Sequence, residues 1–158
     1  MWPDPVEGVA RVLRRAAIEA TLLEFPDGTP TAEAAARAIG CDLDQVVKSV
    51  VFVADGNHVL VLVPGDRRAD EAKVAEAAGA AAVRVAYARE VVAATGYQPG
   101  AVAPFPLRSV GLVLLERTVL QHKRVWVGAG SPSHMAGLAP AELQRLTGAR
   151  AADLAAAR

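Results

Sequence analysis

Two apolar segments joined by a short turn constrain the fold of this chain more than any other feature. The first, 46 to 54, reads V-V-K-S-V-V-F-V-A, and the second, 58 to 63, reads H-V-L-V-L-V. Asp55-Gly56-Asn57 between them is typical of a hairpin loop. Because the second segment is apolar on both faces, we expect it inside a closed or covered sheet rather than at an edge.

Lys48 interrupts the first of these segments with a charge. Side chains alternate between the two faces of a strand, so Lys48 shares a face with Val46, Val50 and Phe52. An ammonium on a buried face is costly unless it is paired or opens to a cavity. The strand therefore lines a wet pocket or lies at a sheet edge. The alternative is a lysine whose stem packs on apolar surface while its tip reaches solvent.

Length and charge limit the class of protein. With 158 residues, the chain suits a single domain over 1–158 that folds without disulfides or metal. Seventeen basic and seventeen acidic side chains cancel, which argues against binding long DNA or RNA duplexes but leaves room for one nucleic-acid terminus. No apolar run approaches the roughly 20 residues that span a membrane. The M-W-P-D-P start is unlike a secretory signal, so a cytoplasmic location is expected.

Capping and turn signals predict helices that separate short strands. We expect Asp4 to cap the first helix, with Pro5 as its first residue. The expected helices cover 4–17, 31–39, a segment from 70 or 71 to 78, 88–95 and 141–146. The further strands cover 20–25, 82–85, 110–115 and 124–128, the last two as a pair. Together with the hairpin, this order predicts an α/β fold with a curled mixed sheet or a barrel, surrounded by helices.

Two irregular segments remain. The first, 95 to 107, reads T-G-Y-Q-P-G-A-V-A-P-F-P-L, and its prolines predict an ordered loop. Such a loop either presents backbone N–H groups to a ligand or forms a rigid crossover between two halves of the sheet. The second, 128 to 134, reads G-A-G-S-P-S-H after a strand. It does not fit a dinucleotide-binding loop, because Pro132 intervenes and the third glycine is absent.

Several reaction classes lack the residues that they need. Ser131 and Ser133 lack the G-x-S-x-G setting of a serine hydrolase, and no P-loop sequence occurs. The isolated histidines and the single cysteine predict no metal site. Lys48, the glycine loop and the turn that ends in His134 suit electrostatic stabilisation of a polarised ester better than covalent attack by the protein.

Three segments carry a resemblance to a known family. They are V-V-K-S-V-V-F-V, the loop G-Y-Q-P-G-A-V-A-P-F with G-x-x-x-P from Gly100 to Pro104, and the ending G-A-G-S-P-S-H-M-A-G-L-A-P-A-E-L. In this order, from about Thr31 to Gly148, they resemble the YbaK and prolyl-tRNA synthetase-associated domains, which deacylate mischarged tRNA. The resemblance implies a mixed β-barrel wrapped by helices. It also implies hydrolysis by water or groups of the substrate, with neither a protein nucleophile nor a cofactor.

The resemblance also implies a role for particular residues. Lys48 is similar to the family's functional lysine, which helps to place the tRNA 3′-terminal nucleotide and the ester. The loop from Gly100 resembles the one whose backbone lies against the aminoacyl group, with Gly100 taken as catalytic and its amide and that of Ala101 as oxyanion donors. His134 is similar to a histidine that some members use in the amino-acid pocket. The expected substrate-binding residues are Ser49, Ala101, Val102, Pro104, Gly128, Gly130 and His134.

The function implied by the resemblance is trans-editing of mischarged tRNA. The substrate would be the 3′ end of tRNA for proline that carries cysteine or alanine, since a synthetase rejects a smaller amino acid by only about 1 to 3 kcal/mol per missing methylene. Prolyl-tRNA synthetase is a candidate partner, because a chain of zero net charge makes few phosphate contacts. The alternatives are a non-catalytic module that binds an aminoacyl or nucleotide-like ligand or a synthetase, and a regulatory protein on the same fold. The oligomeric state stays open.

Overall fold

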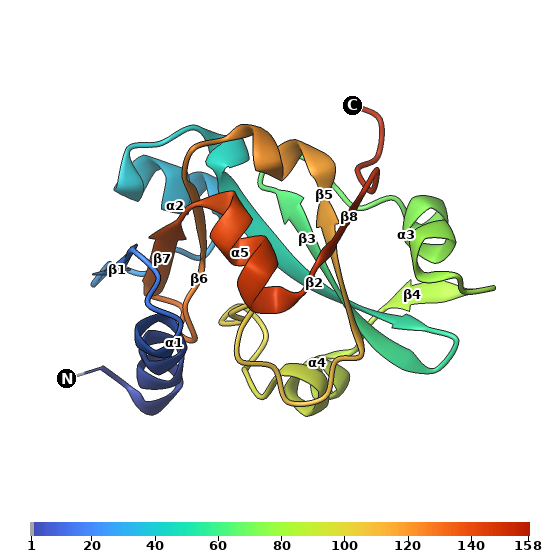
Figure 1. The fold of residues 1–158 in the computed structure, drawn as a ribbon, viewed down its shortest axis with the longest axis horizontal. Coiled ribbons are helices and arrows are strands. Elements are labelled where there is room, and N and C mark those ends of the chain that lie inside the picture. Colours follow the sequence, from blue (N-terminus) through green and yellow to red (C-terminus); the bar gives the residue numbers. More distant parts are fainter. Residues whose placement is uncertain (1) are drawn as a thin grey trace.

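The eight strands within residues 2–158, which the computed structural model describes, form one mixed sheet (Figure 1). The strands are β1 Ala20–Glu24, β2 Val46–Ala54, β3 Asn57–Pro64, β4 Val83–Val85, β5 Leu112–Glu116, β6 Val125–Gly128, β7 His134–Leu138 and β8 Arg150–Ala152. Their order is β1-β7-β6-β2-β3-β5-β8, and β4 pairs with β2 outside this path. The pairs β2–β6, β3–β5 and β5–β8 are parallel and the others are antiparallel. The predicted mixed sheet is confirmed, and β3 lies inside it between β2 and β5.

Helix ends follow the chemistry of their capping residues. The helices are α1 Asp4–Arg15, α2 Ala32–Ile39, α3 Glu71–Ala78, α4 Ala88–Thr95 and α5 Pro140–Thr147, with 3₁₀ turns η1 Leu43–Gln45 and η2 Arg117–Gln121. Thr31 Oγ1 accepts from the Ala34 amide at 3.0 Å at the start of α2. Asp70 accepts from the Lys73 amide at 3.1 Å at the start of α3. The N-terminal helix differs from the prediction, since Pro3 is its N-cap and Asp4 its first residue.

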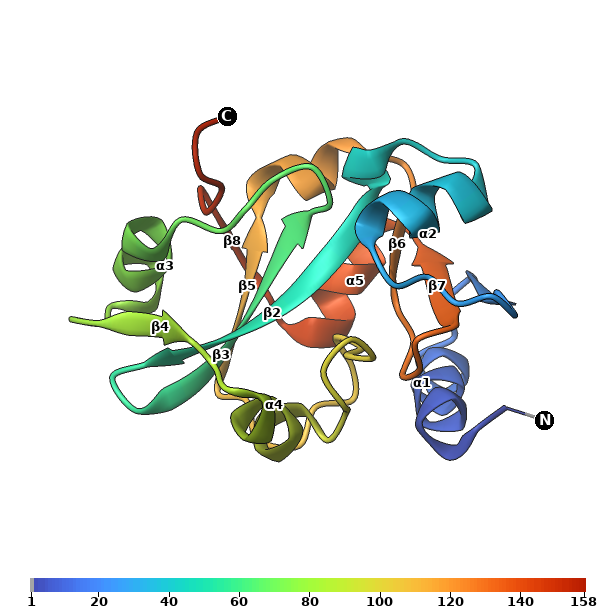
Figure 2. The ribbon, with the colours of Figure 1, turned by 180° about the vertical axis from the view of Figure 1, so that it is seen from behind.

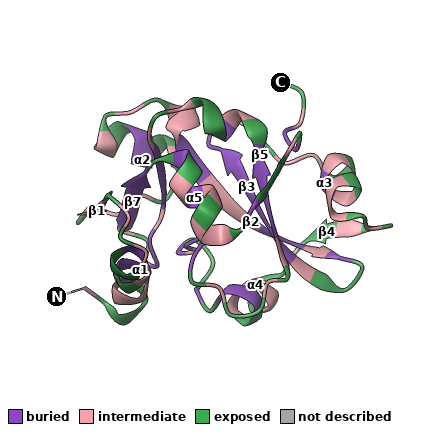
Figure 3. Cartoon of the chain, in the orientation of Figure 1, coloured by how far each residue is buried: buried purple, intermediate pink, exposed green. Residues whose placement is uncertain are grey.

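The helices cover both faces of the sheet and define where the core lies. Buried side chains of α1, α4 and α5 pack on one face, whereas α3 and α2 pack on the other, each over a different part of the sheet. Figure 2 shows α2 and α3 from behind, on either side of the long strand β2. The central strands β2, β3 and β5 are largely buried (Figure 3). Within residues 2–158, no helix is long and apolar enough to cross a bilayer.

The predicted pairing of 110–115 with 124–128 is wrong. β5 pairs with β3 and β8, whereas β6 pairs with β2 and β7. The physical reason is that η2 carries the chain past β3 and β2, which lie between the two strands. β8 was not predicted, because R-A-A lacks both the alternation and the β-branched residues that mark a strand.

The edge of β2 that faces away from β3 is paired only at its two ends. β6 pairs with Val46 and Val47, and β4 pairs with 52–54. Residues 48–51 between these pairings have no strand beside them on this edge. The loop after α4, yellow in Figure 1, supplies Gly100 and Val102 to this region. The sheet therefore has a gap at Lys48 and Ser49, within the described chain.

Candidate active site

A cavity of about 310 Å³ lies at this gap. Its lining residues come from the segment before α2, from α2, β2 and β6, from the loop after α4, and from β7. They are Thr29, Pro30, Thr31, Ala32, Ala35, Val46, Val47, Lys48, Ser49, Gly100, Val102, Gly128 and Met135. Five of the predicted site residues, far apart in the sequence, thus meet in one cavity: Lys48, Ser49, Gly100, Val102 and Gly128.

Lys48 lines the cavity with a partly exposed side chain. Among residues 2–158, its ammonium has neither an ion-pair partner nor a hydrogen-bond acceptor. A cation that the protein itself does not neutralise attracts an anionic or polarised ligand group. Two of the interpretations drawn from the sequence fit the geometry together: the strand lines a pocket, and at Lys48 it lies at a locally unpaired edge of the sheet.

The glycine loop is held at both ends by its own hydrogen bonds. The buried Tyr97 hydroxyl donates to the Phe105 carbonyl at 3.0 Å, and burial raises the pKa of Tyr97 to about 12. The Ser109 amide donates to the Ala94 carbonyl at 2.7 Å. Gly100 has φ +84°, a left-handed conformation that favours glycine. The loop is therefore an ordered element that fixes the Gly100 backbone at the cavity.

Gly128 sets how closely this loop approaches β6. A Cβ atom at position 128 would lie 2.5 Å from the Val102 carbonyl oxygen, which is far inside van der Waals contact. Only glycine allows the loop backbone to rest on the end of β6. Because Gly128 has no side chain, the Val102 backbone can approach β6 closely and form this part of the cavity wall.

The amide donors of the loop differ from the prediction at one position. The Ala101 amide donates to the Gln98 carbonyl at 2.9 Å, so it is already occupied and the prediction of an oxyanion donor at Ala101 is wrong. The turn that places Gly100 in the left-handed conformation causes this internal bond. The Gly100 amide has no acceptor within residues 2–158. It is therefore a loop donor at the cavity that stays available to a ligand.

Four predicted residues lie outside the lining of this cavity: Ala101, Pro104, Gly130 and His134. Gly130 instead packs on the first turn of α1, where a Cβ would lie 2.9 Å from the carbonyl carbon of Pro5. His134 and Met135 are neighbours on β7, so their side chains point to opposite faces. Met135 lines the cavity. His134 is 2% exposed and lies edge-on to the Trp2 ring, with ring centroids 5.4 Å apart.

Ser131, His134 and Glu24 form a row that superficially resembles a hydrolase triad. The Ser131 hydroxyl contacts His134 Nδ1, and Nε2 of the same ring lies 3.3 Å from a Glu24 carboxylate oxygen. The second contact lacks hydrogen-bond geometry, since Nε2 has no hydrogen-bond partner in the described chain. Ser131 also does not line the Lys48 cavity. The row joins β1 to β7 and to the turn before β7, and we assign it a structural role.

Sequence reasoning missed one wall of the cavity. Thr29, Pro30 and Thr31 line it together with two alanines of α2. The P-D-G-T-P sequence before α2 predicted a turn, and Thr31 predicted a cap, but neither signal indicates what the turn faces. The Thr29 hydroxyl donates to the Pro132 carbonyl at 3.1 Å, which ties this wall to the turn before β7.

A larger cavity of about 760 Å³ lies at the other end of the hairpin. Its lining includes the hairpin loop from Asp55 to His58 and the segment from Leu107 to Leu112. The Asp55 carboxylate there accepts from the Ala81 and Ala82 amides at 2.8 and 3.0 Å, and both bonds lower its pKa. We place the candidate active site at the smaller cavity, because five of the predicted site residues line it and none of them lines the larger one.

The fold and this cavity define a class of protein: a ligand-binding domain on a mixed sheet, with a lysine facing a fixed glycine loop. Residues 27–146 match the model of the aminoacyl-tRNA editing domain, and the chain belongs to this family. The candidate site residues from Lys48 to His134 all lie within the matched segment.

Related proteins agree with this assignment. YwhH of Bacillus subtilis (strain 168) is 32% identical over 130 residues, which cover 82% of each chain. Proline–tRNA ligase of Nitratidesulfovibrio vulgaris (strain DP4) is 36% identical over 109 residues, 68% of this chain but 19% of the ligase. A solved structure, proposed to be a trans-editing enzyme for prolyl-tRNA synthetase, superposes with a TM-score of 0.91 at 32% identity and covers 99% of this chain and 100% of its own.

Proposed function

We propose that this chain is a trans-editing deacylase that hydrolyses the ester between a mischarged amino acid and the 3′ end of tRNA for proline. The observation that carries the proposal is that Lys48, which has no counterion among residues 2–158, meets the Gly100 loop in one cavity. Membership of the editing family and the likeness to a trans-editing enzyme support it. Cysteine and alanine are the proposed amino acids to be removed.

The chemistry needs a water molecule and fixed dipoles. Water attacks the ester carbonyl carbon, the bond to the ribose oxygen breaks, and the proton from water ends on the ribose hydroxyl. The products are the free amino acid and uncharged tRNA. The Gly100 amide donates to the carbonyl oxygen as it becomes an oxyanion, and Lys48 offsets negative charge on the phosphate or the carbonyl. Removal of one such donor costs on the order of 100- to 1000-fold in rate.

Replacement of Lys48 tests the proposal. We expect Lys48→Ala to fold, because the side chain makes no bond within the described chain, and to lower kcat/KM for alanyl- and cysteinyl-tRNA for proline by on the order of 100-fold. The measurement is release of radiolabelled amino acid, with circular dichroism as the check on folding. Lys123→Ala, which removes an exposed lysine outside the cavity, is the matched control.

Two outcomes would contradict the proposal. Full activity of Lys48→Ala would remove the lysine from the mechanism. A wild-type protein that binds these tRNAs without turnover would instead be a binding module. Each reaction is run with and without prolyl-tRNA synthetase, which we propose as the partner that supplies tRNA affinity. Added synthetase is then expected to lower KM and leave kcat unchanged.

A further inference from the structure

Ser49 occupies the middle of the gap in the sheet. It lines the cavity of about 310 Å³ and also a second, more apolar cavity of about 180 Å³. The two cavities share Gly100 and Val102, so the glycine loop lies at the boundary between them. Ser49 and the glycine loop therefore lie where the Lys48 cavity meets the apolar one.

The main chain of Ser49 points into this gap. On the same edge of β2, the Val51 carbonyl accepts from the Ala86 amide at 2.9 Å, and the Asp55 amide donates to the Ala82 carbonyl at 3.1 Å. Val46 faces the opposite edge, because its carbonyl accepts from the Gly65 amide at 2.6 Å. Main-chain groups alternate between the two edges of a strand. Ser49, two residues before Val51, thus directs both its N–H and its C=O at the edge that lacks a partner strand.

The Ser49 side chain is also without a partner. Its hydroxyl oxygen is buried and has no hydrogen bond within residues 2–158. A buried polar atom left unpaired is unfavourable, and native proteins rarely keep one without a reason. One residue therefore presents an N–H, a C=O and a hydroxyl at a gap that two cavities share.

We propose that Ser49 recognises the α-amino group of the acyl moiety, so that the substrates are esters with a free α-amino group. The inference rests on the proposed function. The amino nitrogen and the carbonyl oxygen of an aminoacyl group are spaced like the N–H and C=O of one residue, so the group pairs with Ser49 as one rung of an antiparallel ladder. The Ser49 carbonyl and hydroxyl accept from the amino group, and its N–H donates to the ester carbonyl.

Lys48 and Ser49 interact with groups of opposite charge on the substrate. Lys48 points to one face of β2, whereas the bound amino group lies at the open edge of the strand and toward the Ser49 hydroxyl on the other face, so the two cations approach β2 from different directions. This arrangement limits repulsion between two cations that the same site must hold. It assigns the phosphate or carbonyl charge to Lys48 and the amino group to Ser49.

The test uses three esters on the same tRNA for proline: alanyl, lactyl and propionyl, which carry an amino group, a hydroxyl and a hydrogen at the α-carbon. Each kcat/KM is divided by the rate of spontaneous hydrolysis, which removes differences in ester reactivity. We expect the corrected value to fall about tenfold or more from alanyl to propionyl, with lactyl between them. Equal corrected values would overturn the inference and leave the proposed function standing. Failure to hydrolyse any of the three would refute the proposed function itself.

Variants separate recognition from a structural effect. Ser49→Ala is expected to lower kcat/KM for the alanyl ester by about tenfold and to leave the propionyl ester unchanged, because only the former uses the hydroxyl acceptor. Ser109→Ala, which removes an exposed hydroxyl outside both cavities, should change neither ester. An equal loss on all three esters in Ser49→Ala would show a structural role and overturn the inference.

Discussion

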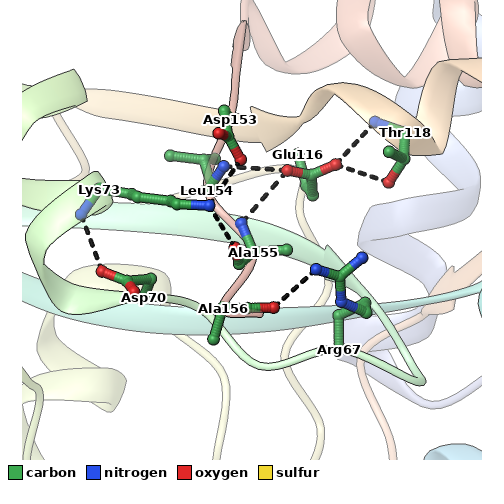
Figure 4. Close-up of polar contacts among 9 residues, drawn as sticks. All are labelled: Arg67, Asp70, Lys73, Glu116, Thr118, Asp153, Leu154, Ala155 and Ala156. Carbon is green, nitrogen blue, oxygen red and sulfur yellow. Dashed lines mark hydrogen bonds and ion pairs between the residues drawn. The ribbon is translucent and has the colours of Figure 1, made fainter. Parts of the chain in front are cut away.

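Glu116 is 1% exposed, and its carboxylate is stabilised by hydrogen-bond donors instead of a cation (Figure 4). One oxygen accepts from the Leu154 and Ala155 amides at 2.9 and 3.2 Å. The other accepts from the Thr118 amide and hydroxyl at 2.8 and 2.6 Å. Desolvation raises the pKa, but the four donors outweigh it, so the pKa of Glu116 lies below its usual 4.5. The carboxylate therefore joins the end of β5 to the C-terminal segment.

Glu116→Gln tests this role in stability. The neutral amide presents its NH₂ group to donors that need an acceptor, so we expect the free energy of unfolding at pH 7 to fall by about 2 to 3 kcal/mol. A lowered folded-state pKa contributes stability that is fully present above the unfolded-state value of 4.5 and is lost as pH falls through the folded-state pKa. The difference between wild type and variant in urea unfolding should thus shrink below pH 4.5.

The exposed Glu142 provides the control for this prediction. It pairs with Arg145 on the surface of α5, so Glu142→Gln should change stability by less than about 0.5 kcal/mol. A Glu116→Gln protein as stable as wild type at pH 7 would show that the four donors find other partners.

At the scale of elements, the contact between the glycine loop and β6 depends on Gly128. The added Cβ of Gly128→Ala would lie 2.5 Å from the Val102 carbonyl oxygen, so the loop must move away from the cavity. We expect kcat/KM to fall at least about tenfold while the fold is retained, because a small displacement of a positioned group is costly in catalysis. Gly111→Ala is the matched control, since a Cβ there meets nothing within 4 Å. Equal activity of the two variants would exclude this role for Gly128.

Local signals in the sequence predicted most elements, because each depends on neighbouring residues. Gly40, Gly79, Gly96 and Gly148 end their helices in left-handed conformations, as a residue without Cβ favours. The pairing of β5 with β6 was predicted wrongly, because strand partners are chosen by distant segments of the chain. A helical turn between two strands does not reveal that two other strands lie between them.

The candidate site was predictable only in part, because some of its residues stand out in their local sequence and others are placed by distant segments of the chain. Lys48 was conspicuous because a charge in an apolar strand conflicts with its surroundings, and Gly100 because it lies in a stiff loop. The alternation of β7 separates His134 from Met135, but only the pairing with β6 shows that Met135 faces the cavity. The gap beside Ser49 arises from the lengths of β4 and β6, which the sequence of β2 does not contain.

At the scale of the whole molecule, the sheet separates the candidate site from the contacts that hold the C-terminal segment. The site lies where β6 meets β2, whereas the segment packs beyond β5, two strands away in the sheet order. Figure 4 shows Lys73 and Arg67 donating to the Ala155 and Ala156 carbonyls, at 2.8 and 2.6 Å, beside the bonds of Glu116. Stability and activity should therefore respond to different substitutions.

Leu154→Ala tests this separation. Leu154 is fully buried among side chains of β2, β3 and α3, so truncation should lower the free energy of unfolding by about 3 kcal/mol through the cavity that it leaves. Deacylation well below the unfolding temperature should stay within about twofold of wild type, because no cavity-lining residue is removed. Leu120→Ala, at a leucine that is 36% exposed, should leave both quantities nearly unchanged.

Lys48→Ala should show the reverse pattern, with stability retained and activity lost. A Leu154→Ala protein that remains folded but loses its activity would show that the two ends of the sheet are coupled, because the substitution would then act on Lys48 through β3, the strand that pairs with it at Val63.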